Sequence, residues 1–284
     1  MLDVRDQLGE GPHWDHVAGE LLRVDIANGL VHAWRPGADA HAWSLSLDGE
    51  VSAVIPREDG GHLLAVGHEL LLRDADGTLA PLAGVERELP DNRFNDCRCD
   101  PQGRLWAGTM SRSRMAGAAA LYRLSPERRL EAVLTGTTIS NGIGWSADGE
   151  RMCFVDSTLQ RIDAFDVDPA TGALSNRRTL IEVDPADGLP DGLAIDAEDG
   201  IWVALFGGGA LRRYDAGGTL TAHVELPVTN PTCPTFGGAR LDVLYVTSAR
   251  HRLSAAQLAA EPLAGALLAL DPGVRGRRAN RFRG

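Results

Sequence analysis

Three short stretches of this 284-residue sequence each place an oxygen-bearing side chain directly before a glycine. Glu10 lies in LGEGPHWD, Asn141 in SNGIGW and Asp191 in PDGLAI. Carboxylate and carboxamide oxygens are ligands that Ca²⁺, Mg²⁺ and Mn²⁺ prefer, and glycine lets the backbone pass close to whatever lies beside it. If the fold brings the three residues together, they can hold one divalent cation and leave positions for water or a substrate.

Other catalytic patterns are missing from the sequence. It contains no G-x-S-x-G nucleophile elbow, and its histidines and cysteines show no zinc-site spacing, although oxygen ligands do not exclude Zn²⁺. The four cysteines include no C-x-x-C pair and are predicted to be buried, reduced thiols. His13, three residues after Glu10, is interpreted as an ordinary strand histidine, with orientation of a ligand as the alternative.

A sequence repeat indicates how such distant residues are positioned. Six short apolar runs begin at residues 21, 63, 105, 152, 201 and 244, at intervals of 42, 42, 47, 49 and 43 residues. Most are followed by a second strand-like run, and only residues 254–260 suggest helix. Units of roughly 40 to 50 residues with about four short strands are typical of β-propeller blades. The sequence therefore predicts an all-β, six-bladed β-propeller in which residues 1–284 form a single domain, with a short ring-closing strand around residues 2–5.

The repeat also predicts where the oxygen-bearing residues lie. The positions ten or eleven residues before the six apolar runs are Glu10, Ser52, Asn95, Asn141, Asp191 and Cys233. The first strand of each propeller blade lines the central channel, so these residues should meet at one mouth of it. Two buried carboxylates facing each other would repel, and a divalent cation removes this conflict. The tryptophans expected to pack between blades are Trp14, Trp106, Trp145 and Trp202.

Charge and composition limit the possible partners. With 28 basic and 39 acidic residues the formal net charge is −11, so no nucleic-acid or membrane-surface partner is expected. No apolar run reaches the roughly 18 residues of a membrane span, and no signal-peptide pattern is present. A cytoplasmic protein is therefore expected, as a monomer or weak homo-oligomer. The arginine-rich end, Arg275 to Arg283, is predicted to be a solvated tail.

The chain resembles the senescence marker protein, gluconolactonase and luciferin-regenerating family in stretches that follow one another along nearly its whole length. The matching stretches are LGEGPHWD from Leu8, NRFNDCRCDPQGRLWAGTM from Asn92, SNGIGWSADG from Ser140, IDAFDVDPATGALSNRR from Ile162, PDGLAIDAEDGIWVA from Pro190 and FGG from Phe236. The resemblance implies a six-bladed propeller with one divalent metal ion (Ca, Mg, Mn or Zn) that hydrolyses small-molecule sugar lactones to aldonic acids.

The resemblance also implies roles for individual residues. Glu10, Asn141 and Asp191 correspond to the metal ligands, and Asp191 corresponds in addition to the proposed general base. Arg93 and Asn95 resemble the pair that contacts the substrate. A carboxylate that binds a cation is a weaker base, so either its free oxygen activates the attacking water or a metal-bound hydroxide attacks directly.

One segment departs from the family pattern. After the AGTM stretch many relatives carry a further acidic substrate contact, whereas this chain has Ser111-Arg112-Ser113-Arg114 in a shortened segment. The sugar preference of the family therefore does not transfer to this chain.

Two alternative functions keep the same site. One is a hydrolase of other activated esters, including phosphotriesters. The other is a non-catalytic calcium-binding regulatory protein of regucalcin type, since regucalcin is included in the same family. An interaction propeller is disfavoured, because such propellers usually place no carboxylates at the axis.

Overall fold

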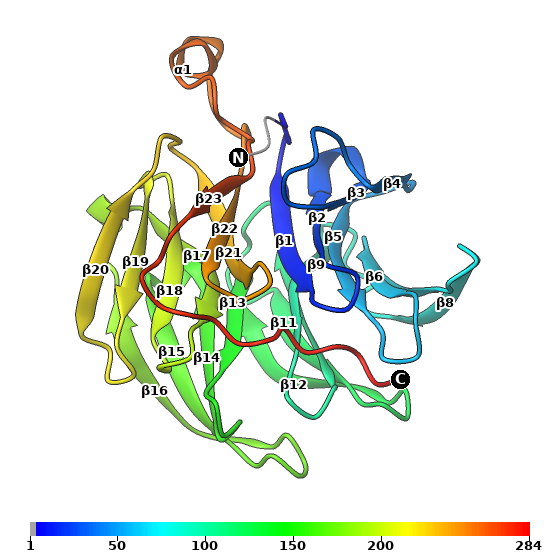
Figure 1. Cartoon of the computed structure of the whole chain (residues 1–284). Helices are drawn as coiled ribbons and strands as arrows, with labels where there is room; N and C mark the ends of the chain where they lie inside the picture. The colour runs from blue at the N-terminus through cyan, green and yellow to red at the C-terminus, as the bar shows by residue number, and fades with distance from the viewer. Residues whose placement is uncertain (1–3) are drawn as a thin grey trace.

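The computed structural model describes residues 4–284, and its β-sheets are arranged around a central axis (Figure 1). Six sheets form the ring, and each takes its strands from consecutive segments of the chain. The prediction of an all-β, six-bladed β-propeller is confirmed.

The strands follow the predicted repeat. In the first three blades they are β1 (Gly9–Asp15), β2 (Glu20–Asp25), β3 (Leu30–Trp34) and β4 (Trp43–Ser46); β5 (Val51–Pro56), β6 (His62–Val66), β7 (Glu69–Arg73) and β8 (Leu79–Gly84); and β9 (Asn92–Cys99), β10 (Leu105–Ser111), β11 (Ala119–Leu124) and β12 (Leu130–Thr137). In the last three they are β13 (Ser140–Trp145), β14 (Arg151–Asp156), β15 (Arg161–Val167) and β16 (Leu174–Glu182); β17 (Leu189–Ile195), β18 (Ile201–Phe206), β19 (Ala210–Tyr214) and β20 (Leu220–Glu225); and β21 (Pro231–Gly237), β22 (Val243–Ser248) and β23 (Leu268–Leu270).

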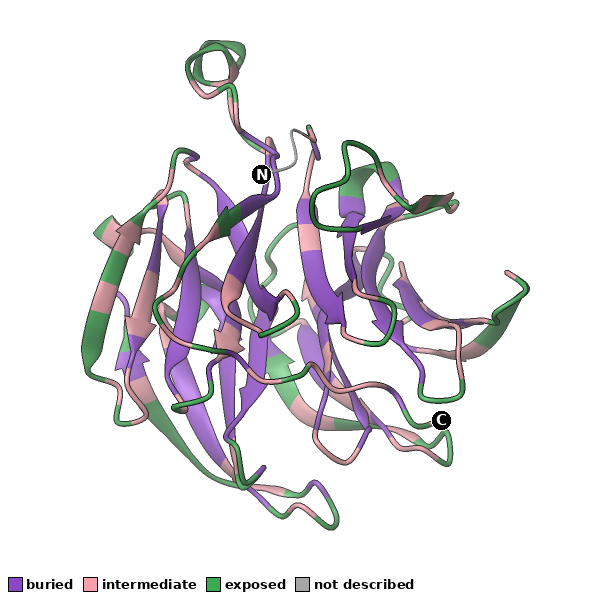
Figure 2. Ribbon diagram, viewed as in Figure 1, coloured by how far each residue is buried: buried purple, intermediate pink, exposed green. Residues whose placement is uncertain are grey.

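The first strand of every blade faces the axis. These strands contact one another around the ring, β1 with β5, β5 with β9, β9 with β13, β13 with β17, β17 with β21 and β21 with β1. Burial falls from the axis outward: β5 and β13 are buried along their whole length, whereas the outermost strands β16 and β20 are largely exposed (Figure 2). The apolar runs found in the sequence are therefore the second strands, which pack between neighbouring sheets.

Aromatic side chains fill the spaces between blades. The rings of Trp106 and Trp145, from the third and fourth blades, lie with their centroids 5.7 Å apart. Trp202 contacts Phe236 across the next-to-last interface at 6.4 Å, and Trp14 stacks on Tyr245 where the last blade meets the first. The predicted role of these tryptophans is confirmed.

Within residues 4–284 the last blade has three strands and no fourth. Residues 2 and 3 of the predicted closing strand lie outside the described residues, and Val4 and Arg5 are not in a strand. Instead β1 contacts both β21 and β22, and Leu8 forms a bridge with Ala249. The short helix α1 (Ala255–Ala260) follows, with Ser254 as its N-cap, as the sequence indicated.

The prediction of a solvated C-terminal tail is wrong. Residues 275–283, here named the C-terminal strap, cross the end of the channel opposite to the N-terminus and α1 (Figure 1). Gly276 bridges to Asp196 of the fifth blade and Phe282 to Arg57 of the second. Phe282 is fully buried in an apolar cluster that includes Ile55 of β5. The arginines around Phe282 made the segment look solvated in the sequence. One buried side chain is nevertheless enough to hold a strongly charged segment against the protein.

Two further features bear on function. The four cysteines, Cys97, Cys99, Cys153 and Cys233, are free and buried, as predicted. Within residues 4–284, no helix is long and apolar enough to cross a membrane.

Candidate metal and substrate site

The structure brings together all five residues singled out in the sequence. Glu10 lies on β1, Asn141 on β13 and Asp191 on β17, while Arg93 and Asn95 lie on β9. Each is near the start of the innermost strand of its blade. All five line one cavity at the end of the channel near α1.

Irregular strand pairing occurs at each of the three oxygen-bearing positions. The pairing of first and second strands shifts register between Glu10 and His13, between Ser140 and Ile143, and between Pro190 and Leu193. Such bulges interrupt the regular alternation of side chains between the two faces of a strand and so change the direction in which a side chain points. The bulge therefore turns these side chains toward the axis at equivalent places in three blades.

The glycines after these residues allow the inner strands to approach one another. A Cβ atom on Gly142 would lie 2.7 Å from the carbonyl oxygen of Asp191, and one on Gly192 would lie 2.3 Å from Cys233 Sγ. Real Cβ atoms essentially never make such contacts. The expectation that glycine permits a close approach holds, but what approaches is the backbone or side chain of the next blade.

Hydrogen bonds link the polar side chains across blades. Arg93 Nη1 donates to Asn95 Oδ1 at 2.8 Å, and Asn95 Nδ2 donates to Asn141 Oδ1 at 2.8 Å. Asn141 Nδ2 in turn donates to Ser157 Oγ at 2.8 Å, and this hydroxyl donates to the carbonyl oxygen of Pro190 at 2.7 Å. The network fixes the orientation of both carboxamides.

Two residues of this arrangement were missed in the sequence. Ser157 begins a short 3-10 helix after β14 and is buried, and Glu50 follows a turn before β5. Glu50 forms an ion pair with Arg93, with Oε1 3.4 Å from Nε, and accepts a hydrogen bond from Arg112 Nε at 2.7 Å. Neither residue has a local pattern that distinguishes it from an ordinary turn residue, so no sequence signal would have found it.

The remaining equivalent positions are polar but contribute no cation ligand. Ser52 Oγ donates to the carbonyl oxygen of Phe94 at 2.5 Å. Cys233 is fully buried, and burial raises the pKa of its thiol well above the ordinary value. Arg98 Nη2 donates to Cys233 Sγ at 3.0 Å. The three candidate oxygen ligands thus come from three of the six blades.

The two carboxylates are electrostatically strained without a cation. Burial and the charge of nearby Asp96 raise the pKa of Glu10 to about 8. Burial raises the pKa of Asp191 well above its usual range, and the charges of Glu10 and Asp96 act in the same direction. Among the described side chains, none forms an ion pair with Glu10 or Asp191; Oε2 of Glu10 accepts a hydrogen bond from the backbone N–H of Gly11 at 2.9 Å.

This donor set fits a hard divalent cation. Two carboxylates without an ion pair among the described residues, together with a carboxamide oxygen, match the oxygen preference of Ca²⁺, Mg²⁺ or Mn²⁺. Residues 4–284 hold no group of three or more histidine, cysteine, aspartate or glutamate side chains placed to bind a metal ion. The candidate ligands Glu10, Asn141 and Asp191 do not form such a group, because Asn141 contributes a carboxamide.

The cavity above this floor has a volume of about 280 Å³. That is close to the lower end of the roughly 300–1,000 Å³ of ligand pockets and suits one small ring. Its walls combine polar and apolar side chains. The apolar ones are Leu8, Ile26, Ala27, Met110, Ile139, Leu189 and Phe206.

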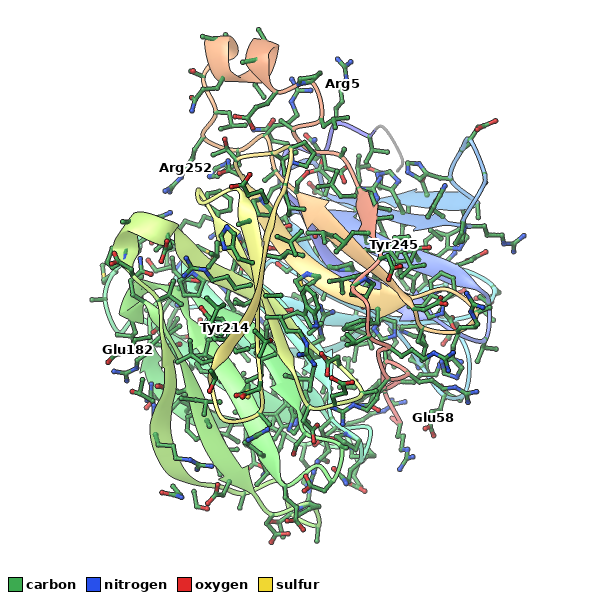
Figure 3. All side chains as sticks on the ribbon, turned by 60° about the vertical axis from the view of Figure 1, so that its left-hand side comes forward. Arg5, Glu58, Glu182, Tyr214, Tyr245 and Arg252 are labelled. Atoms are coloured by element: carbon green, nitrogen blue, oxygen red, sulfur yellow. The ribbon has the colours of Figure 1, made fainter. Side chains whose placement is uncertain are left out.

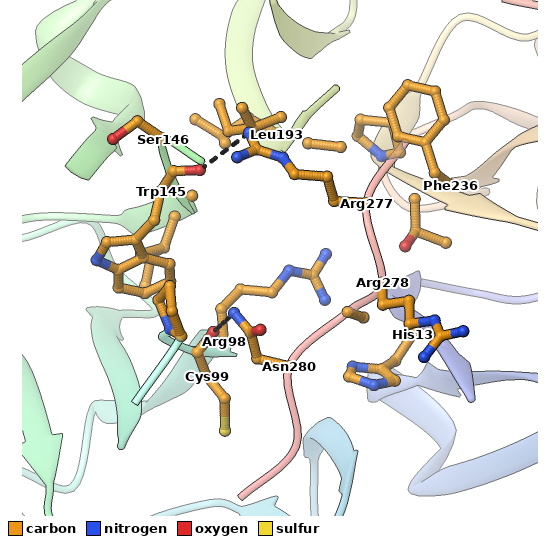
Figure 4. Close-up of a pocket in the computed structure, with 18 of the residues that line it drawn as sticks. His13, Arg98, Cys99, Trp145, Ser146, Leu193, Phe236, Arg277, Arg278 and Asn280 are labelled. Atoms are coloured by element: carbon orange, nitrogen blue, oxygen red, sulfur yellow. Dashed lines mark hydrogen bonds between the residues drawn. The ribbon is translucent and has the colours of Figure 1, made fainter. Parts of the chain in front are cut away.

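A second cavity of about 230 Å³ lies at the opposite end of the channel, beneath the C-terminal strap (Figure 4). Arg277 Nη2 donates to the carbonyl oxygen of Trp145 at 3.4 Å, and Asn280 Nδ2 donates to that of Cys99 at 3.1 Å. His13 lines this cavity, and burial lowers its pKa to about 3, so it is neutral. His13 is thus separated from the oxygen ligands, and the interpretation as a strand histidine is favoured. No carboxylate lines this second cavity among the described residues.

Comparison with known proteins places the chain in a family. Residues 8–250 match the SMP-30/Gluconolactonase/LRE-like region. Regucalcin from Oryctolagus cuniculus is 36% identical over 276 residues, which cover 94% of this chain and 92% of that protein.

Solved structures agree with this match. A calcium-binding protein, regucalcin, from Agrobacterium tumefaciens is 33% identical, with a TM-score of 0.94 over 99% of this chain and 96% of that one. A luciferin-regenerating enzyme is 30% identical, with a TM-score of 0.92 over the same shares of the two chains. This protein therefore belongs to the SMP-30/gluconolactonase/LRE-like family.

Proposed function

We propose that this protein is a metal-dependent hydrolase that opens sugar lactones to aldonic acids. One observation carries the proposal: two buried carboxylates from different blades, Glu10 and Asp191, line the same cavity of one-ring size, form no ion pair with a described side chain, and have raised pKa values despite the nearby charge of Arg93. Membership of a family named in part for gluconolactonase agrees with this assignment.

Glu10, Asn141 and Asp191 would hold the divalent cation. When bound, such a cation polarises a lactone carbonyl, stabilises negative charge on its oxygen and makes water more acidic. The hydrogen bond from Asn95 Nδ2 to Asn141 Oδ1 and the link from Asn141 to Ser157 keep the carboxamide in place. Positioning of this kind reduces the reorganisation needed during reaction.

Arg93 and Asn95 are suited to binding the sugar. Both Nδ2 protons of Asn95 are used, by Asn141 Oδ1 and the carbonyl oxygen of Ser140. Asn95 Oδ1 accepts one hydrogen bond, from Arg93 Nη1, and keeps one lone pair for a sugar hydroxyl. Arg93 Nη1 is used by Asn95 and by the carbonyl oxygen of Phe94, whereas Nη2 makes no hydrogen bond to the described residues. Arg93 can therefore donate to the substrate.

Asp191 is the candidate general base. Water adds its oxygen to the lactone carbonyl carbon and the ring C–O bond breaks. The ring oxygen takes one proton and becomes a hydroxyl group, and the new carboxylic acid releases the other proton to solvent as it ionises. In this proposal Asp191 accepts the proton of the attacking water through a carboxylate oxygen. A bound cation would lower the pKa that burial raises in this carboxyl, which would keep it ionised and able to accept a proton, although as a weaker base.

The proposal is tested by acid release from aldonolactones. EDTA-treated protein should not exceed the spontaneous rate, and Ca²⁺, Mg²⁺, Mn²⁺ or Zn²⁺ added back should restore initial rates. Glu10→Gln and Asp191→Asn should each lower metal affinity and turnover at least about 100-fold. Asp76→Asn, in an exposed hairpin turn, is the matched control and should leave both unchanged. Full activity in both site variants would refute the assignment.

The regucalcin relatives favour a second candidate, a calcium-binding protein without catalysis. Calcium binding that depends on Glu10 and Asp191, together with no rate above background on lactones, would support it. Phosphotriesters and other activated esters belong in the same panel, because a hydrolase of those substrates would use the same cation.

A further inference from the structure

The mouth of the site cavity carries an unusual concentration of arginines. Arg112 and Arg114 lie in the segment that begins at the end of β10, and Arg252 lies between β22 and α1. All three line the cavity, as does Arg93 deeper inside it. Figure 3 shows Arg252 at the α1 end of the molecule, with Glu58 near the opposite end. The mouth is therefore basic on two sides that come from different blades.

Only part of this positive charge is neutralised within the cavity. Glu50 pairs with both Arg93 and Arg112. Arg114 and Arg252 form no ion pair within residues 4–284, although Arg252 Nε lies 3.2 Å from His251 Nε2. Burial, followed by the charges of Arg252, Arg93 and Arg114, lowers the pKa of His251. The charges of the three arginines thus act on one small region of the mouth.

The charge count indicates what this mouth attracts. Four arginines and three carboxylates, Glu10, Glu50 and Asp191, line the cavity, so one divalent ion on the floor would leave an excess of three positive charges. The whole chain carries a net charge of −11. A locally reversed charge inside a cleft concentrates ligands of opposite sign and raises their rate of association.

We propose that the lactone substrate of this protein carries an anionic group, a carboxylate or a phosphate, in addition to its uncharged lactone ring. Arg114 and Arg252 bind this group at the mouth while the lactone carbonyl lies on the floor. The inference rests on the proposed function, because it names the substrate class of the same site. Arginine suits this role, since its planar guanidinium donates paired hydrogen bonds to carboxylate and phosphate oxygens.

The test compares matched substrate pairs with the metal-loaded protein. Glucaro-γ-lactone and glucono-γ-lactone share a ring and differ by a terminal carboxylate; phosphoglucono-δ-lactone and glucono-δ-lactone differ by a phosphate. The anionic member of at least one pair should have a kcat/KM about tenfold or more above its neutral partner, and which pair shows this identifies the anion. Equal or lower values for the anionic member of both pairs would overturn the proposal.

Variants at the mouth locate the effect. Arg114→Gln and Arg252→Gln should each lower kcat/KM for the preferred anionic lactone roughly tenfold, mainly through a higher KM, and change the neutral partner less than about twofold. Arg129→Gln is the matched control, since Arg129 is exposed in the turn before β12 on the outside of the third blade. An equal loss on neutral and anionic lactones would contradict a role in anion binding.

A binding measurement separates failure of this inference from failure of the proposed function. Titration calorimetry should show glucarate or phosphogluconate binding the metal-loaded protein more tightly than gluconate, with the difference lost in Arg114→Gln. If no lactone is opened but this binding preference is present, the hydrolase proposal fails and the anion site stands. If glucono-δ-lactone is opened and no anionic ligand is preferred in rate or binding, the anion site fails and the hydrolase stands.

Discussion

At the scale of single residues, the pairing of Glu10 with Asp191 dominates the chemistry of the site. Burial disfavours the charged form of both carboxyl groups and nearby negative charges act in the same direction, so without a cation the folded protein holds protons that an unfolded chain would release. The same protons compete with a divalent ion for the carboxylate oxygens. The proposed metal binding and the protonation of these two side chains are therefore linked.

This linkage predicts how stability depends on pH. Because the pKa of Glu10 rises from its ordinary 4.5 to about 8 on folding, the metal-free protein should lose stability as pH increases between these values. A divalent cation replaces the protons, so Ca²⁺ should raise the melting temperature more at pH 8 than at pH 5.5. Thermal unfolding at both pH values with and without Ca²⁺ measures this difference. Glu10→Gln should reduce it, and a Ca²⁺ effect that is larger at pH 5.5 would contradict the linkage.

At the scale of structural elements, the bulged inner strands decide the geometry of the site. Each bulge turns one side chain toward the axis, and the glycine beside it allows the neighbouring inner strand to approach. Gly192 is the clearest case, because Cys233 of β21 occupies the space that a Cβ would need. Packing between blades and ligand position are set by the same residues.

Gly192→Ala should therefore affect both stability and metal binding. The added methyl group would separate β17 from β21, at a cost of roughly 1–3 kcal/mol in the free energy of unfolding, and would displace Asp191. Denaturant unfolding and calcium titration measure the two effects. Gly217→Ala, in an exposed turn, serves as the control. Combining Gly192→Ala with Cys233→Gly should recover part of the lost stability and calcium affinity. If nothing is recovered, the contact with Cys233 is not the cause of the loss.

At the scale of the whole molecule, the C-terminal strap holds blades together at the end opposite to the site. Besides the buried Phe282, Arg277 Nη2 lies 2.8 Å from Asp199 Oδ1, and Arg283 Nε lies 2.8 Å from Glu58 Oε1. These partners belong to the fifth and second blades. The strap thus contributes to closing a ring whose last blade has three strands in the described part of the chain.

Phe282→Ala should destabilise the protein without damaging the site. Truncating a fully buried phenylalanine costs about 3–5 kcal/mol in the free energy of unfolding. Arg283→Gln, at a half-exposed ion pair, should change it by less than about 1 kcal/mol. Calcium affinity of the folded Phe282→Ala protein should equal that of the parent, because the strap lies at the other end of the channel. A large loss of affinity below the unfolding transition would show that the two ends are coupled.

The sequence alone determined the blade repeat and the position of Glu10, Asn95, Asn141 and Asp191 within it. These features are local, since a short apolar run, a turn and a glycine recur at a nearly constant interval whether or not the ring is closed. The roles of the individual residues as ligands and base stay predictions, which the experiments above address.

Only the tertiary structure decided which other side chains join these four residues at the site. Ser157, Glu50 and Arg252 carry no local pattern, and Phe282 is disguised by the arginines around it. Their contacts connect residues from different blades, and closure of the ring alone brings those residues together. A period in the sequence fixes which residues begin the inner strands, but the side chains that meet at the mouths and between the sheets are fixed by how six twisted sheets pack around one axis.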